Sequence, residues 1–133
     1  MTQNHPTPHV PISWGELIDK ITILEIKVER LAGAQSRANA GKELALLCAI
    51  ASAVLAENPA IAMLAAQLKS VNEALWEIED HIRDKERVGT FDADFIALAR
   101  SIYQRNDERG RIKHQINQAL ASELIEEKNY KPY

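Results

Sequence analysis

The sequence contains little cysteine and no excess of positive charge. Cys48 is the only cysteine among 133 residues, so no internal disulfide can form, and we interpret its side chain as a buried small hydrophobe. A reducing compartment fits this composition, and we expect a cytoplasmic protein. Lysine and arginine number 16 against 19 aspartate and glutamate, giving a net charge of −3. Because nucleic-acid binding needs a basic surface, we expect no nucleic-acid partner.

The sequence also lacks a hydrophobic run long enough to predict a membrane span. Residues 44–56 are apolar apart from Ser52, but such a run is too short to cross a bilayer, and Glu57, Asn58 and Pro59 interrupt it. We therefore predict a buried helix here and no membrane span. The first 11 residues contain His and Pro where a secretory signal would need an apolar stretch, so we expect no export signal.

Apolar residues are abundant, at 46% of the chain, and they recur at intervals of three and four residues. This spacing places them on one side of a helix, and the length fits one domain. The sequence therefore predicts an all-α fold, an antiparallel bundle of about four helices with a long C-terminal helical hairpin. We expect a flexible N-terminal arm over residues 1–11, a single helical domain over 12–128 and a C-terminal tail over 129–133.

The ends of the predicted helices are marked by capping residues and glycines. Ser13 followed by Glu16 is a capping box that begins the first helix, and Gly33 is a plausible stop. The second helix is predicted over about 38–57. The third begins at Asn58–Pro59 and ends near residue 87, before Gly89. The fourth begins at 90–92 and ends near residue 126. Because the first two helices are shorter than the hairpin, they leave apolar surface uncovered, which favours a homodimer.

The hairpin carries a patch of polar residues beside its apolar seam. When the chain is folded at Gly89, Asn72 comes level with Asn106 or Asp107, and Val71 comes level with Arg109. The predicted ligand-binding residues are Asn72, Trp76, Glu79, Asp80, Arg83, Tyr103, Asn106 and Arg109. We expect the arginines to bind an anionic group, the aromatic rings to stack, and the carboxylates to orient the arginines or hold a cation. The alternative is a structural patch in which Glu79 and Arg83 form a surface pair and asparagines fix the register.

The other charged residues and the histidines favour a solvated surface. Most charges of the first helix are expected on a solvated face, including a Glu16–Lys20 pair. The four histidines have no spacing typical of metal ligands or of a catalytic triad, so they are interpreted as surface residues. We predict no metal site and no cofactor.

Several sequence blocks resemble a family of small uncharacterised bacterial proteins. The blocks are residues 11–27 (PISWGELIDKITILEIK), 71–83 (VNEALWEIEDHIR), 95–103 (FIALARSIY), 106–109 (NDER) with 112–113, and 126–130 (EEKNY). The alanine-rich second helix departs from the family's pattern. The resemblance implies a domain of unknown function whose members tend to accompany glycosyltransferases and surface-polysaccharide genes.

Three functions of different classes fit the sequence. The first is a non-catalytic accessory protein of polysaccharide or lipopolysaccharide biosynthesis, whose partner is a glycosyltransferase or a sugar-nucleotide enzyme. The alternative is a magnesium-dependent nucleotide pyrophosphohydrolase, because Glu16 with Asp19 and Glu77 with Asp80 have the Glu-x-x-Asp spacing of such all-helical enzymes. A chorismate-mutase-like bundle is the third, with cations recruited from Lys20, Lys27, Arg30, Arg83 and Arg109.

Overall fold

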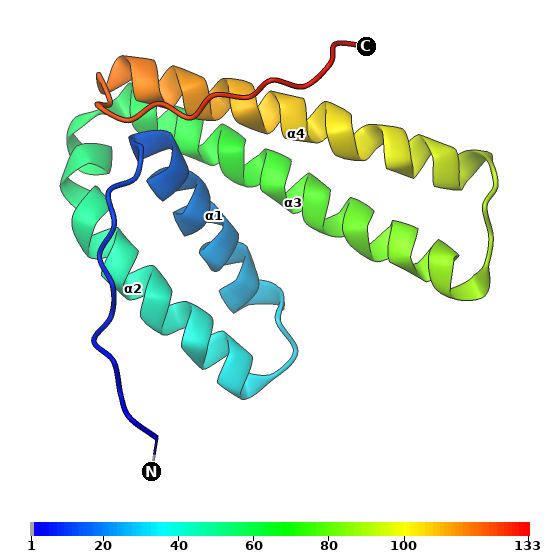
Figure 1. Ribbon diagram of the computed structural model, residues 1–133, viewed down its shortest axis with the longest axis horizontal. Helices are drawn as coiled ribbons and strands as arrows, with labels where there is room; N and C mark the ends of the chain where they lie inside the picture. Colours follow the sequence, from blue (N-terminus) through cyan, green and yellow to red (C-terminus); the bar gives the residue numbers. More distant parts are fainter. Residues whose placement is uncertain (1) are drawn as a thin grey trace.

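Residues 2–133 form four helices joined by short turns (Figure 1). The computed structural model describes residues 2–133, and that part of the chain contains no β-strand. The helices are α1 (Trp14–Arg30), α2 (Ala34–Glu57), α3 (Pro59–Val88) and α4 (Ala93–Ala119). The prediction of an all-helical chain with four helices is confirmed, and α3 and α4 lie side by side as a long hairpin.

Three helix ends have local capping signals, and those at Ser13 and Gly89 were predicted. The side chain of Ser13 accepts a hydrogen bond from the backbone N–H of Glu16, which satisfies an amide that the first turn leaves free. Gly89 ends α3 in the left-handed region at φ 71°, which glycine adopts without steric cost. Asp92 caps α4 by accepting from the N–H of Phe95.

The turns on either side of α2 differ from the prediction. The helix begins at Ala34 rather than near Ala38, because Arg37 donates to the carbonyls of Leu31 and Ala32 and so allows a tight connection from α1. Asn58 stands at the start of α3 as predicted, but its side chain donates backward to the carbonyl of Val54. It therefore closes the end of α2 instead of capping α3.

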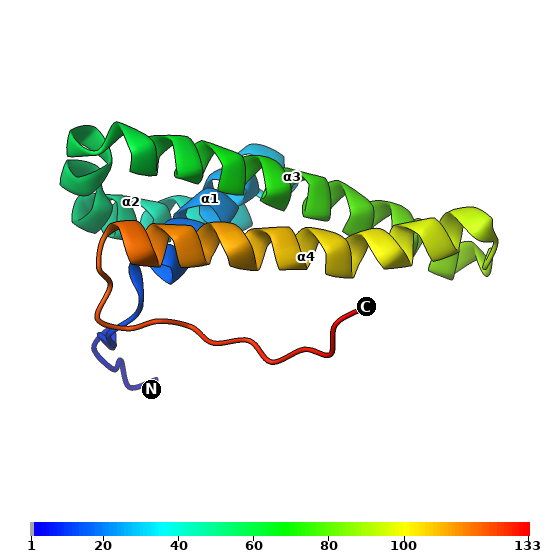
Figure 2. The same cartoon turned by 90° about the horizontal axis from the view of Figure 1, so that it is seen from above.

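The prediction that α4 reaches residue 126 is wrong, because the helix ends at Ala119. The N–H of Ser122 binds the carbonyl of Asn117, and the N–H of Ala121 binds that of Gln118. These two bonds form a Schellman motif, which requires a left-handed residue, and Ala121 takes that position at φ 49°. The chain then reverses, and residues 120–133 run back beside α4 (Figure 2).

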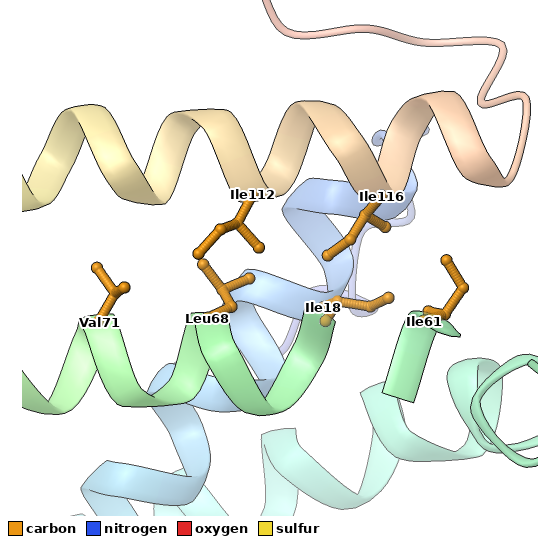
Figure 3. Packing of buried hydrophobic residues seen from close by; sticks show 6 residues of the cluster. All are labelled: Ile18, Ile61, Leu68, Val71, Ile112 and Ile116. Atoms are coloured by element: carbon orange, nitrogen blue, oxygen red, sulfur yellow. The ribbon is translucent and has the colours of Figure 1, made fainter. Parts of the chain in front are cut away.

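The core lies where α1 crosses the hairpin. Ile18 of α1 points between α3 and α4, into a cluster of buried side chains from all three helices (Figure 3). The cluster comprises Ile18, Ile61, Leu68, Val71, Ile112 and Ile116. A second cluster packs α1 on α2 through Leu17, Ile21 and Ala51. The helix α1 therefore uses both of its apolar faces and contacts every other helix.

The far half of the hairpin has no such core. No residue from 73 to 111 is buried, and the free end of the hairpin extends beyond α1 and α2 (Figure 1). The apolar seam continues there, but Ile78, Ile82, Leu98 and Ile102 are half-buried, because two helices alone cannot enclose a seam.

The prediction that residues 44–56 form a buried helix is wrong. The helix α2 rests on α1 and α3 along one side, and 11% of its most apolar 18-residue window is buried. Cys48 is half-buried, and that burial raises the pKa of its thiol. By length and composition alone, α2 could cross a membrane. The absence of a membrane span therefore stays a prediction.

Candidate functional site

The carboxylate of Asp19 is the centre of a buried polar network that joins α1, α3 and α4. Asp19 is 0% exposed. It shares the second face of α1 with Gly15 and Thr22, at spacings of four and three residues. Arg109 on α4 binds both carboxylate oxygens, with its Nε 2.9 Å from Oδ1 and its Nη2 on Oδ2. Such a two-bond geometry fixes the guanidinium relative to the carboxylate.

Asn72 on α3 is the second side chain that donates directly to the Asp19 carboxylate. Its Nδ2 donates to Asp19 Oδ1 and to Thr22 Oγ1, each over 2.9 Å. The Thr22 hydroxyl in turn donates to the backbone carbonyl of Asp19 over 2.8 Å. A single carboxylate thus holds one side chain from each helix of the hairpin.

Lys113 extends the network toward the C-terminal segment. Its Nζ lies 2.7 Å from Glu16 Oε2 and 2.8 Å from Glu126 Oε2, and it is 3.8 Å from Asp19 Oδ2. The predicted Glu16–Lys20 pair is therefore wrong, because Glu16 faces α4. The prediction of a solvated face on α1 also fails at Asp19.

The charged forms of the network residues stabilise one another. Burial alone would raise the pKa of Asp19, but the hydrogen bonds from Arg109 and Asn72, with the charges of Arg109 and Lys113, lower it. Burial opposes the charge on Lys113, whereas hydrogen bonds to Glu126 and Glu16 raise its pKa. The bond to Lys113 lowers the pKa of Glu126. The carboxylates are therefore held ionised and the lysine protonated.

The first turn of α1 is pressed against α4 beside this network. A Cβ on Gly15 would lie 2.5 Å from the backbone oxygen of Lys113, so the position requires glycine. The N–H of Gly15 donates to Asn117 Oδ1 over 2.7 Å, and the N–H of Trp14 donates to Ser122 Oγ over 3.3 Å. Side chains of α4 and of the turn after it therefore satisfy amides that the start of α1 leaves free.

The buried polar atoms of the network are hydrogen-bonded. Among residues 2–133, every buried side-chain nitrogen or oxygen has a partner. A buried charge is tolerated when it is paired and hydrogen-bonded in this way, whereas an unpaired one costs several kcal/mol. The arrangement joins three helices through paired charges.

The structure brings together some of the predicted site residues and separates others. Asn72 and Arg109 meet at Asp19, and Asn106 Oδ1 accepts from Arg109 Nη1 over 3.5 Å. Tyr103 lies one helical turn before Asn106 on α4 and is 43% exposed.

The remaining predicted residues lie outside the network. Glu79 and Arg83 form a surface pair on α3 with a distance of 3.1 Å, as the structural alternative has it. Asp80 is exposed, and Trp76 is half-buried.

Five network residues were absent from the predicted site. They are Glu16, Asp19, Thr22, Lys113 and Glu126. The spacing Gly15, Asp19, Thr22, Ile26 alternates four, three and four, which is a second seam on α1 with polar residues inside it. That pattern could have identified Asp19 and Thr22. Nothing in the local sequence identifies Glu126, because it reaches Lys113 only after the chain reverses.

The C-terminal segment runs beside α4 (Figure 2), and a groove lies between the two, next to the network. Its volume is about 660 Å³, and a neighbouring groove of about 760 Å³ lies along the same segment. The first groove is lined by Ile102, Tyr103, Asn106, Asp107, Arg109, Lys128, Tyr130, Lys131 and Tyr133. Tyr133 packs edge-on against Tyr103, with ring centres 4.9 Å apart, which holds the segment over the groove.

The groove offers positive charge and aromatic surface. Lys128 and Lys131 form no salt bridge within the described part of the chain, so their charges are available to a ligand. The side chain of Lys128 crosses α4 at Gly110, where a Cβ would come within 3.6 Å of it. Cations beside tyrosine rings can bind a ligand that carries both a phosphate and a ring.

The chain was compared with curated proteins, solved structures and family profiles. No curated protein and no solved structure matches it. One family profile does, over residues 8–133, a range that includes all four helices, the network around Asp19 and both grooves. Its description is "Family of unknown function (DUF6165)". The chain therefore belongs to this family of unknown function.

Proposed function

We propose that this protein is a non-catalytic accessory protein that binds a phosphorylated sugar, free or linked to a nucleotide, in the groove between α4 and the C-terminal segment. The observation that carries the proposal is the groove's lining, in which Lys128 and Lys131 stand beside three tyrosines. Ammonium groups bind phosphate oxygens, and tyrosine rings present flat apolar surface to a sugar or a base.

The neighbouring acidic groups support a binding role. Asp19 is held by Arg109, and Glu16 is held by Lys113 over 2.7 Å, so both carboxylates are already paired with cations. In the other Glu-x-x-Asp pair, Glu77 accepts from Arg30 and Asp80 is exposed. Within residues 2–133, no three histidine, cysteine, aspartate or glutamate side chains are grouped as metal ligands would be. No specific observation favours the alternative of a magnesium-dependent hydrolase.

The biological setting that we propose is polysaccharide or lipopolysaccharide assembly in the bacterial cytoplasm. Its substrates are phosphorylated sugars and nucleotide sugars, which match the chemistry of the groove. A glycosyltransferase or a sugar-nucleotide enzyme is then the partner that delivers or receives the ligand.

A thermal-shift screen tests the proposal with nucleotides, nucleotide sugars and sugar phosphates, each with and without Mg²⁺. A ligand at 100 times its Kd should add about 2.7 kcal/mol to the free energy of unfolding. We expect a stabilising shift with at least one phosphorylated sugar and no requirement for Mg²⁺.

Matched variants assign the shift to the groove. Lys128→Ala with Lys131→Ala should abolish it, because both free charges are lost. Lys20→Ala removes an exposed lysine of α1 and should leave the shift unchanged. The proposal would be overturned if no compound of the panel shifted the unfolding temperature, or if the double variant retained the shift.

A further inference from the structure

The outer face of α2 is an apolar stripe that no other residue within 2–133 covers. The helix packs against α1 through Leu44, Leu47 and Ala51, and it lies on the outside of α1, away from α4 (Figure 1). Its opposite side carries exposed residues at spacings of four, three, one, three and four. They are Lys42, Leu46, Ala49, Ile50, Ala53 and Glu57. Leu46 is 58% and Ile50 is 59% exposed, which is unusual for large aliphatic side chains on one helix face.

We infer that this stripe binds the same stripe of a second copy of the chain, with the two α2 helices antiparallel about a two-fold axis. The midpoint of the stripe lies between Ala49 and Ile50, and the residues are symmetric about it. A two-fold axis through that point would place each residue opposite its mirror position in the partner, as an isologous interface requires.

The side chains are complementary under this symmetry. Leu46 of one copy faces Ala53 of the other, and Ile50 faces Ala49. A large side chain therefore meets a small one at every apolar position. Alternation of large and small residues allows two helices to interdigitate without voids. A parallel pairing would instead place Leu46 against Leu46 and Ile50 against Ile50.

The charges at the two ends of the stripe are also complementary. Lys42 and Glu57 each lie about 11 Å from the midpoint, at 1.5 Å per residue. In the antiparallel pair, Lys42 of each copy faces Glu57 of the other, so two ion pairs flank the apolar centre. In a parallel pair, like charges would meet at both ends.

The same residues argue against a lipid surface as the occupant. Helices that lie on membranes carry Lys and Arg along the polar borders of their apolar face. Between Lys42 and Glu57, α2 has one charged residue, Glu43, which is acidic. A membrane span would also have to expose to lipid the side that packs on α1, where Ala51 is 0% exposed.

The molar mass in solution tests the inference, measured on the full-length protein by sedimentation equilibrium. We expect a reversible dimer, and Ile50→Glu should raise its dissociation constant at least about tenfold, because it buries a charge at the two-fold axis. Met63→Glu introduces the same charge at a side chain of α3 that is 64% exposed, and it should leave the dimer intact. Lys42→Glu should weaken the dimer, and adding Glu57→Lys should restore it.

Disulfide trapping fixes the orientation, with Cys48 first replaced by alanine. Leu46→Cys together with Ala53→Cys should give a covalent dimer under mild oxidation, whereas each cysteine alone should not. Crosslinking by Leu46→Cys alone would indicate the parallel arrangement and overturn the symmetry. A monomer at all concentrations, a dimer that Ile50→Glu leaves intact, or a wild-type monomer that cosediments with lipid vesicles would overturn the inference.

Discussion

Asp19 shows how one buried charge can determine the position of three helices. Its carboxylate is 0% exposed, yet it remains ionised because Arg109 and Asn72 donate directly to it. Burying the pair costs desolvation energy that the attraction offsets only in good geometry. We therefore expect the network to contribute more to the uniqueness of the helix arrangement than to net stability.

Removal of one partner from this pair should be far more costly than removal of both. Arg109→Met leaves a buried carboxylate without its main partner and should lower the free energy of unfolding by about 3–5 kcal/mol. Adding Asp19→Asn removes the unpaired charge and should recover at least about 1 kcal/mol of that loss. Urea unfolding at neutral pH measures both values.

Arg83→Met is the matched control, because Arg83 forms an exposed pair with Glu79 on the surface of α3. It should change the free energy of unfolding by no more than about 0.5 kcal/mol. An equal cost for Arg83→Met and Arg109→Met would show that the buried pair has no special role.

At the scale of the helices, the sequence predicts those ends whose signals are local. Ser13, Gly89 and Asp92 act within four residues of the backbone groups they satisfy, so each can be found without knowledge of the fold. The end of α4 has no such signal, because the left-handed position carries Ala121 instead of glycine. The stop depends on tertiary contacts: Asn117 binds Gly15, and Glu126 binds Lys113.

The same distinction separates the predicted from the missed site residues. Asn72 and Arg109 share the two-helix seam of the hairpin, so folding the sequence at Gly89 is enough to bring them level. Asp19 joins them from α1, and the angle at which a third helix crosses a hairpin cannot be read from one sequence. Lys113 was missed because its partners lie in α1 and in the reversed C-terminal segment.

Two alanine–glycine exchanges test whether tertiary contacts fix these positions. Ala121→Gly should raise the free energy of unfolding by about 0.5–1 kcal/mol, because it relieves a left-handed alanine. Gly15→Ala improves helix propensity but would place its Cβ 2.5 Å from the oxygen of Lys113. It should therefore lower the free energy of unfolding by about 1–3 kcal/mol, as overpacking does. Thermal and urea unfolding measure both, and a stabilising Gly15→Ala would contradict the close approach of α1 to α4.

At the scale of the whole molecule, stabilising contacts are concentrated at one end. The buried residues of the hairpin lie within 61–72 of α3 and 112–117 of α4, where α1 crosses. The far half, from 73 to 111, has continuous helices and no buried residue. A helix held only by its own hydrogen bonds is marginally stable in water, and most helix stability in proteins comes from the packing of an apolar face. The two halves of the same two helices should therefore differ in local stability.

Hydrogen exchange measured by mass spectrometry tests this difference along the hairpin. Amides in residues 78–102 should exchange at least about tenfold faster than those in 61–72 and 112–117, because local opening there exposes little new apolar surface. The α2 interface between copies would not alter this contrast, since α2 packs on α1 and on the start of α3. Uniform protection of both halves would show that the half-buried seam at Ile78 and Ile102 is covered in solution, and would place a second contact surface at the free end of the hairpin.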